Sequence, residues 1–121
     1  MNKETRAESE PLLSVVFYRT GAGNEPVREW LKSLKREDRK TIGEDLKTAQ
    51  YGWPLGMPLV RKLEPGLWEV RSIITQGVAR VILTVQGNTM VLLHGFIKKS
   101  RKTPTAQLDT ARRRLADLRQ E

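Results

Sequence analysis

Hydrophobic positions in the first half of the chain follow one strand pattern and then two helix patterns. Residues 12–18 (LLSVVFY) are rich in β-branched and aromatic side chains and lead into a glycine-containing loop, which predicts a strand. A helix is predicted to follow, with Asn24 as its cap and Pro26 in its first turn. Apolar spacing predicts a second helix over residues 36–51, ended by a glycine. Residues 1–11 show no such pattern and are predicted to be a disordered leader.

The second half alternates between apolar and polar side chains. Residues 67–74, 78–85 and 89–96 each show this period of two, and only a few turn-forming residues separate them. Turns this short join antiparallel neighbours, because a parallel crossover needs a dozen or more residues. The pattern therefore predicts an antiparallel meander, to which residues 59–63 could add a short strand.

A helix is predicted at the end of the chain, where Thr103 would supply the cap and Pro104 the first-turn proline. Its apolar stripe consists of Leu108, Ala111, Leu115 and Leu118. The order of elements predicts an α+β fold, with two N-terminal helices and the C-terminal helix packed on one face of a twisted, mainly antiparallel sheet. A chain of 121 residues fits one domain better than two, so residues 12–121 are expected to form a single domain.

Charge adds a first indication of function. The chain has 22 Lys and Arg against 14 Asp and Glu, a formal net charge of +8, and a pI near 10.2. Such a surplus attracts polyanions such as nucleic acid, but it is equally compatible with a basic domain whose charge only keeps it in solution. The absence of cysteine excludes disulfides and thiolate metal sites. With neither a signal peptide nor a membrane span in the sequence, we expect a cytoplasmic protein.

Familiar catalytic motifs are missing. The chain has no P-loop and no GxGxxG motif, and its serines lack a nucleophile elbow. A single histidine and scattered carboxylates give no metal-ligand spacing, so neither a metal nor a cofactor is predicted.

Cationic side chains instead gather around the predicted sheet. Arg71 and Arg80 lie on consecutive strands, at positions that alternate away from the apolar face, and Glu69 shares their side. The basic segment 96–102 (FIKKSRK) follows the last strand. If the helices cover one face, these groups share the uncovered face, which suits an RNA backbone and a stacked base. The alternatives are a sheet edge protected by lysines or a solvated loop.

Such a set could cleave RNA without a metal. The 2′-hydroxyl attacks its phosphate when a base removes its proton, cations stabilise the pentacoordinate phosphorus, and an acid protonates the leaving 5′-oxygen. Arginine suits the charge clamp, and Glu69 is the only acid on the proposed face, hence the candidate general base. A desolvated lysine is another candidate acid or base. His94 titrates near neutral pH, although its strand position is more typical of a packed structural histidine.

Two other groups of residues are interpreted structurally. Trp30 and Trp68 are predicted to belong to the core. The basic run 112–114 is predicted to be the solvated side of the last helix.

Three segments resemble the HigB-type, phage Gp49-like branch of the RelE/ParE toxin superfamily. They are GLWEVRS (66–72), the strand around Arg80 and LLHGFIKKSRKTP (92–104), of which the last is the most specific. The resemblance implies a RelE-like, microbial-ribonuclease-like fold and inhibition of translation by mRNA cleavage on the ribosome. It also implies neutralisation by an antitoxin, commonly a helix-turn-helix protein.

By position, the resemblance implies that Arg71 and Arg80 are the basic strand residues of the active face. Glu69 stands where some relatives carry an acidic general base and others a lysine. The tyrosine or histidine–tyrosine pair of better-known relatives is missing, so the acid and base stay open. As catalytic residues we rank Arg71, Arg80 and Lys99 above Glu69 and His94. The expected RNA-binding residues are Phe96, Lys98, Arg101 and Lys102.

Two classes of function fit these residues. The first is the toxin of a type II toxin–antitoxin system, a ribosome-dependent endoribonuclease. The second is a non-catalytic RNA- or protein-binding module of phage origin with the same fold.

Overall fold

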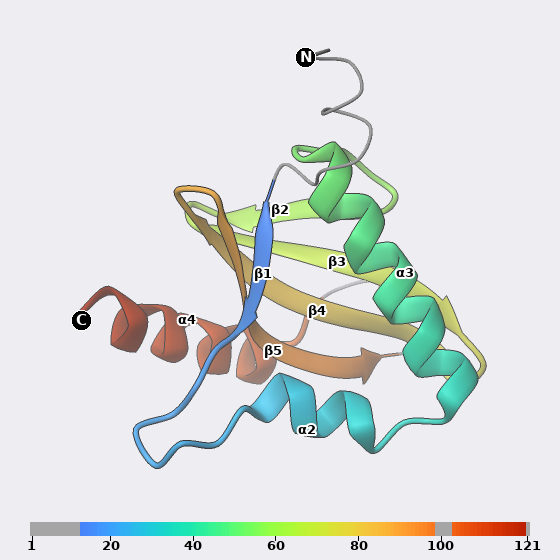
Figure 1. Ribbon diagram of the computed structural model, residues 1–121, viewed down its shortest axis with the longest axis horizontal. Coiled ribbons are helices and arrows are strands. Elements are labelled where there is room, and N and C mark those ends of the chain that lie inside the picture. The colour runs from blue at the N-terminus through green and yellow to red at the C-terminus, as the bar shows by residue number, and fades with distance from the viewer. Residues whose placement is uncertain (1–12, 99–102, 121) are drawn as a thin grey trace, which may run out of the picture.

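The computed structural model describes residues 13–98 and 103–120. They form an α+β structure with three helices and one mixed sheet of five strands. In chain order the elements are β1 (Ser14–Phe17), α2 (Pro26–Lys32), α3 (Arg36–Gly52), β2 (Val60–Glu64), β3 (Leu67–Ile74), β4 (Gly77–Gln86), β5 (Thr89–Lys98) and α4 (Thr105–Arg119) (Figure 1). The predicted leader and the candidate site residues Lys99, Arg101 and Lys102 lie outside the described residues.

The strand order is β1-β5-β4-β3-β2. Strands β2 to β5 pair antiparallel with their neighbours in sequence, so the predicted meander is confirmed. Strand β1 pairs parallel with β5, from Ser14 opposite Thr89 to Phe17 opposite Leu92, and lies at the edge of the sheet (Figure 1).

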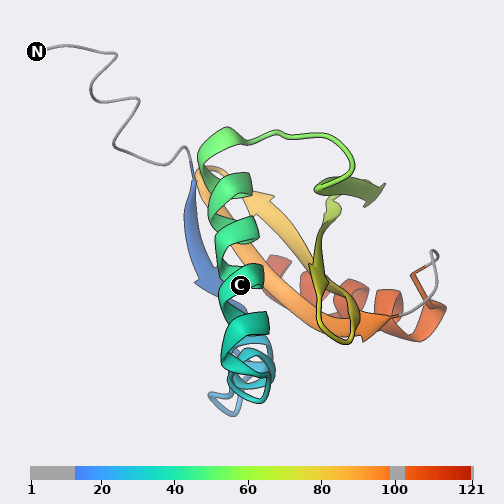
Figure 2. The ribbon, with the colours of Figure 1, turned by 90° about the vertical axis from the view of Figure 1, so that its right-hand side faces the viewer.

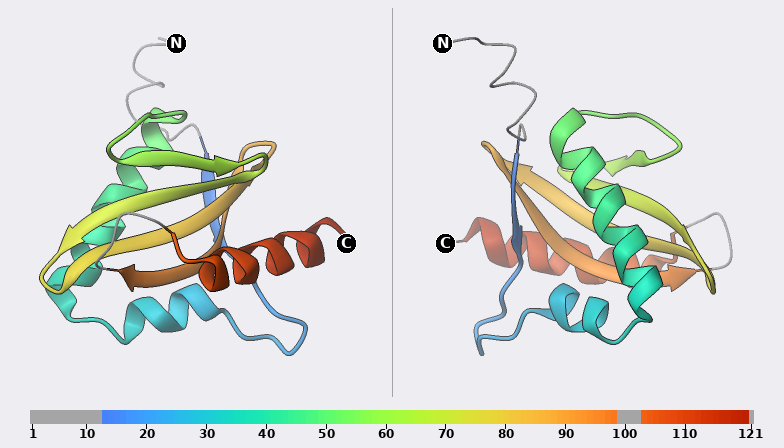
Figure 3. Two further views of the ribbon diagram at one scale, coloured as in Figure 1. Left: turned by 180° about the vertical axis from the view of Figure 1, so that it is seen from behind. Right: turned by 45° about the vertical axis from the view of Figure 1, so that its right-hand side comes forward.

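The helices cover both faces of the sheet, so the expectation that all of them pack on one face is wrong. Helices α2 and α3 lie on one side and α4 lies on the other (Figures 2 and 3). The reason is visible in β4, where Val81 and Leu83 pack towards α2 and α3 while Ile82 packs towards α4. A strand that is apolar on both sides needs cover on both sides. Within the described residues, no helix is long and apolar enough to cross a membrane.

Helix α2 begins at Pro26 as predicted, but Asn24 is not its cap. The N-cap residue is Glu25, which makes no side-chain capping hydrogen bond. The backbone N–H of Asn24 instead donates to the Thr20 hydroxyl at 3.1 Å, which closes the preceding loop.

Two tryptophans pack against the core between the sheet and the helices α2 and α3, as predicted. Trp30 of α2 lies directly over Gly95 of β5, where a Cβ atom would overlap the indole ring. Trp68 of β3 contacts Trp53 edge to face, with ring centroids 5.4 Å apart. Gly95 therefore allows α2 to approach the sheet closely.

Candidate functional site

Glu69, Arg71 and Arg80 lie on the same face of the sheet, as their alternation predicts. Arg71 stands opposite Arg80 in the β3–β4 register, and Glu69 is two residues before Arg71. Arg80 Nη1 donates to Glu69 Oε2 at 3.3 Å. However, these residues share the face on which α4 packs, because Arg80 alternates in step with Ile82 of the α4-side core. The predicted uncovered face is therefore partly covered.

Burial separates these three residues. Glu69 and Arg80 expose none of their surface, whereas Arg71 is half-buried. Burial lowers the pKa of Arg80, and the charge of Glu69 opposes this shift. The guanidinium stays protonated, since arginine does not lose its proton in proteins. Two charges removed from water in this way are stable only as a hydrogen-bonded pair.

Thr103 completes this buried pair. Its hydroxyl donates to Glu69 Oε1 at 2.9 Å and accepts from Arg80 Nη1 at 3.3 Å. The prediction that Thr103 caps the last helix is wrong, because Pro104 is the N-cap residue of α4. The Thr103 hydroxyl instead makes a hydrogen bond to each of the two buried charges. The start of α4 is thus tied to the middle of the sheet.

Arg61 of β2 is a third arginine on this face, and our sequence-based reasoning missed it. It stands opposite Glu69 in the β2–β3 register, and its Nη1 lies 4.0 Å from Glu69 Oε2. Its side chain is 38% exposed. The signal was the tight turn after residues 59–63, since a hairpin at this turn places Arg61 beside the following strand. We call Arg61, Arg71 and Arg80 around Glu69 the arginine cluster.

Arg71 faces an open cavity of about 350 Å³ at the edge of β3 beyond β2. Among the described residues its Nε atom is buried without a hydrogen-bond partner. The cavity is also lined by Thr41 and Asp45 of α3, by Leu59 and Val78, and by Ile73, which is 84% exposed. The arginine cluster carries three cations against one carboxylate. Arg61 and Arg71 are partly accessible, so the cluster can bind an anionic ligand such as a phosphate group, although the carboxylate of Asp45 at the cavity opposes this binding.

His94 packs under α4, as the structural reading of this residue predicted. Its ring stacks on Phe96 at 5.6 Å, its Nε2 contacts the Gln107 side-chain oxygen, and its Nδ1 lies 3.3 Å from Arg114 Nη1. Burial lowers the pKa of His94 below 6.5, and the charges of Arg114 and Arg113 lower it further, while the bond to Gln107 opposes the shift. Its surroundings therefore favour the neutral form of the imidazole.

Phe96 and Lys98 are the RNA-binding candidates that the structure describes. Phe96 is only 7% exposed and belongs to the core between the sheet and α4, so its ring is not presented to a nucleotide base here. Lys98 is the last residue of β5, pairs with Val78 and is half-buried. Strand β5 therefore ends beside Val78, and Val78 also lines the edge cavity.

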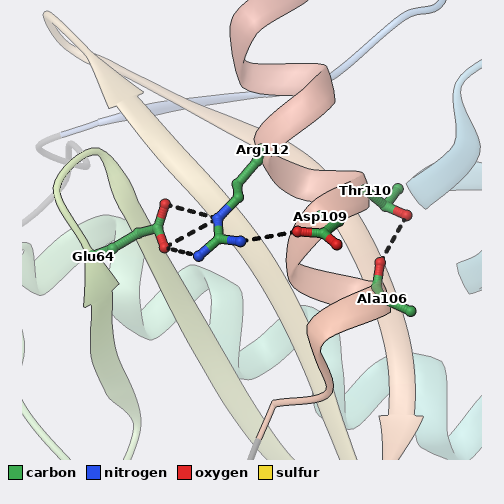
Figure 4. A network of polar contacts seen from close by, with 5 residues as sticks. All are labelled: Glu64, Ala106, Asp109, Thr110 and Arg112. Carbon is green, nitrogen blue, oxygen red and sulfur yellow. Dashed lines mark hydrogen bonds and ion pairs between the residues drawn. The ribbon is translucent and has the colours of Figure 1, made fainter.

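The run 112–114 is only partly solvated, which corrects the prediction for it. Arg112 Nη2 lies 2.7 Å from Glu64 Oε1, and Arg112 Nη1 lies 2.9 Å from Asp109 Oδ1 (Figure 4). Arg114 turns inward and donates to the Leu93 carbonyl at 2.8 Å. These contacts hold α4 against both the end of β2 and the middle of β5. Arg113 is exposed.

The arrangement favours anion binding over acid–base chemistry. Glu69, the predicted general base, is buried and already accepts from two donors. In residues 13–98 and 103–120, no group of His, Asp and Glu side chains is arranged to hold a metal ion. The partly accessible side chains of the cluster are those of Arg61 and Arg71.

Comparison with known proteins gives one family. The family profile described as "Phage derived protein Gp49-like (DUF891)" matches residues 29–116. This span contains the whole arginine cluster, His94 and Thr103. A comparison with curated proteins found no match.

Proposed function

Because the chain belongs to the Gp49-like family of phage-derived proteins, a RelE-type toxin-like family, we propose that it is the toxin of a type II toxin–antitoxin system. In this proposal the protein has a RelE-like fold and HigB-type activity. It cuts messenger RNA on the ribosome and thereby inhibits translation in the cytoplasm. A helix-turn-helix antitoxin is its proposed partner.

The arginine cluster is the observation that carries this proposal. Arg71 stands half-buried at an open cavity, with Arg80 directly opposite it on β4. A guanidinium placed in this way binds a phosphodiester bidentately and stabilises the extra negative charge of the pentacoordinate phosphorus. The net charge of +8 attracts RNA to the protein as a whole.

Arg80 and Glu69 take a supporting role in this proposal. Both are fully buried, so they act by holding the neighbouring strands and Thr103 in place, and Arg71 makes the contact with the phosphate. The general base is then a lysine or a group of the ribosome. Lys99 remains a proposed catalytic residue, and Arg101 and Lys102 remain proposed RNA-binding residues. All three lie outside the described part of the chain.

A non-catalytic RNA- or protein-binding module is the second candidate. One observation favours it: the carboxylate and the histidine that the structure describes near the cluster are both packed against protein groups. A binding module needs the same cations but no proton transfer. The two candidates therefore differ in whether mRNA is cut.

The deciding experiment is induced expression in a bacterial host, with growth followed and mRNA 5′ ends mapped. We compare the wild type, Arg71→Gln and the control Arg28→Gln, which removes the same charge from α2 on the other side of the sheet. A nuclease arrests growth and creates new mRNA ends, and both effects disappear in folded Arg71→Gln but persist in Arg28→Gln. If the wild-type protein accumulates without antitoxin and leaves growth and mRNA intact, the nuclease proposal fails and the binding module replaces it.

A further inference from the structure

The Arg61 side chain is 38% exposed, whereas that of Arg80 is 1% exposed. We infer that Arg61 is a phosphate-binding residue that acts together with Arg71 on the same RNA strand. This inference rests on the proposed function and extends it to a residue on a third strand, β2.

The contacts of Glu69 leave Arg61 able to exchange partners. Arg80 Nη1 lies 3.3 Å from Glu69 Oε2, whereas Arg61 Nη1 lies 4.0 Å from the same oxygen. If Arg61 turns to another anion, Glu69 keeps its bonds to Arg80 and Thr103. No buried charge is then left without a partner, and leaving one would be the main obstacle to such a movement.

The two arginines near Glu69 differ in how accessible they are to a ligand. The Arg80 side chain is 1% exposed and the Arg61 side chain is 38% exposed. Arg80 therefore cannot reach a bound strand without unpacking the sheet face. Arg61 can, because more than a third of its side chain is exposed, and long basic side chains usually keep the charged end in solvent.

The register places Arg61 near Arg71. Arg61 stands opposite Glu69, and Arg71 is two residues further along the same strand, so Arg61 and Arg71 are diagonal neighbours on one face. Diagonal pairs have Cα atoms about 7–8 Å apart, within reach of two long side chains. Glu69 lies between them, but Arg80 neutralises it. The exposed part of this face is therefore cationic and suited to successive phosphates of one strand.

The test measures binding without cleavage. The probe is a short single-stranded RNA carrying 2′-O-methyl groups, and its affinity is measured by fluorescence anisotropy over a series of salt concentrations. A lost phosphate contact lowers the slope of log affinity against log salt by about 0.7 for a single strand. We expect this change in Arg61→Gln. Arg61→Lys should keep the wild-type slope but bind more weakly, since an ammonium cannot bind a phosphate bidentately.

Arg28→Gln is the matched control. Arg28 is also an arginine beside a carboxylate, 3.3 Å from Glu25, with its side chain 55% exposed, but it lies on α2 across the sheet. If Arg28→Gln changes the slope as much as Arg61→Gln, the effect is one of net charge and the inference is overturned. A wild-type slope in Arg61→Gln also overturns it.

Two further results separate this inference from the proposed function. If the wild type binds RNA and arrests growth while Arg61→Gln is unchanged in both, the proposed function stands and the role of Arg61 falls. If the wild type neither binds the probe nor affects mRNA, both fall together. Arg61→Gln should unfold at the wild-type temperature, and a large decrease would show that Glu69 depends on Arg61, contrary to the inference.

Discussion

Arg80 of β4 and Glu69 of β3 form an ion pair across neighbouring strands, with a nitrogen–oxygen distance of 3.3 Å and side chains that are 1% and 0% exposed. Either charge alone would be strongly destabilising in this place, because a buried charge without its partner keeps the full desolvation penalty. Substitution of Arg80 therefore tests the fold before it tests any activity.

Removal of Arg80 should destabilise the protein severely. We expect Arg80→Ala to lower the free energy of unfolding by about 3–5 kcal/mol, measured by urea denaturation. The double variant Arg80→Met with Glu69→Leu should recover much of this loss, since it removes both charges. The exposed pair of Arg28 and Glu25 is the control, where Arg28→Ala should change stability by less than about 1 kcal/mol. A wild-type urea midpoint in Arg80→Ala would contradict this account.

Loss of the Thr103 hydroxyl should loosen the attachment of α4. Hydrogen bonds to charged groups contribute about 1.5–3 kcal/mol, so we expect Thr103→Val to lose roughly that much stability. Thr103→Ser should retain most of it. The control is Thr110→Val, because the Thr110 hydroxyl only donates to the Ala106 carbonyl within α4 (Figure 4). Equal losses at the two positions would refute a special role for Thr103.

Alanine should lower the stability of the protein at Gly95 and raise it at Gly43. At Gly95 a Cβ atom would overlap the Trp30 ring, and such overpacking costs about 1–3 kcal/mol. At Gly43, inside α3, nothing lies within 4 Å of the added Cβ atom, so Gly43→Ala should stabilise by about 0.5–1 kcal/mol. Thermal unfolding of both variants checks the pair. A stable Gly95→Ala protein would mean that α2 does not sit as closely on β5 as the structure shows.

His94 should make stability depend on pH below its ordinary pKa. Its pKa in the folded protein is lowered below 6.5, mainly by burial, so the unfolded chain takes up the proton first as the pH falls. The contribution of His94 is complete above pH 6.5 and is lost as the pH falls through the lowered value. Urea midpoints measured across this range should fall less steeply in His94→Gln. Identical pH profiles in the two proteins would exclude this contribution.

Local patterns in the sequence were enough to predict most of the elements. Alternation and short turns predicted β3, β4 and β5 and their antiparallel order, because both signals act between residues close in sequence. Helix α3 begins at residue 36 as predicted and extends to Gly52, the residue expected to end it. The shared face of Glu69, Arg71 and Arg80 followed from the same alternation.

Features that depend on distant residues were not predictable in this way. Alternation places Arg80 on a polar-looking face, but it does not show that Thr103 and α4 bury that face. A buried arginine and an exposed one look alike in sequence, since arginine is mostly exposed unless paired. Arg61 was missed for a related reason, because its role depends on a partner across the β2–β3 hairpin. Helix α4 lies on the second face since β4 is apolar on both sides, which a strict alternation pattern hides.

The parallel pairing of β1 with β5 has a consequence for how the molecule is made. Ser14 stands opposite Thr89 in the register, and β5 is the strand beside β1 in the described sheet. During synthesis from the N-terminus, β1 leaves the ribosome long before β5 exists, and pairing between such distant segments forms late in folding. We expect the nascent chain to remain without its edge strand in place until β5 has emerged from the ribosome.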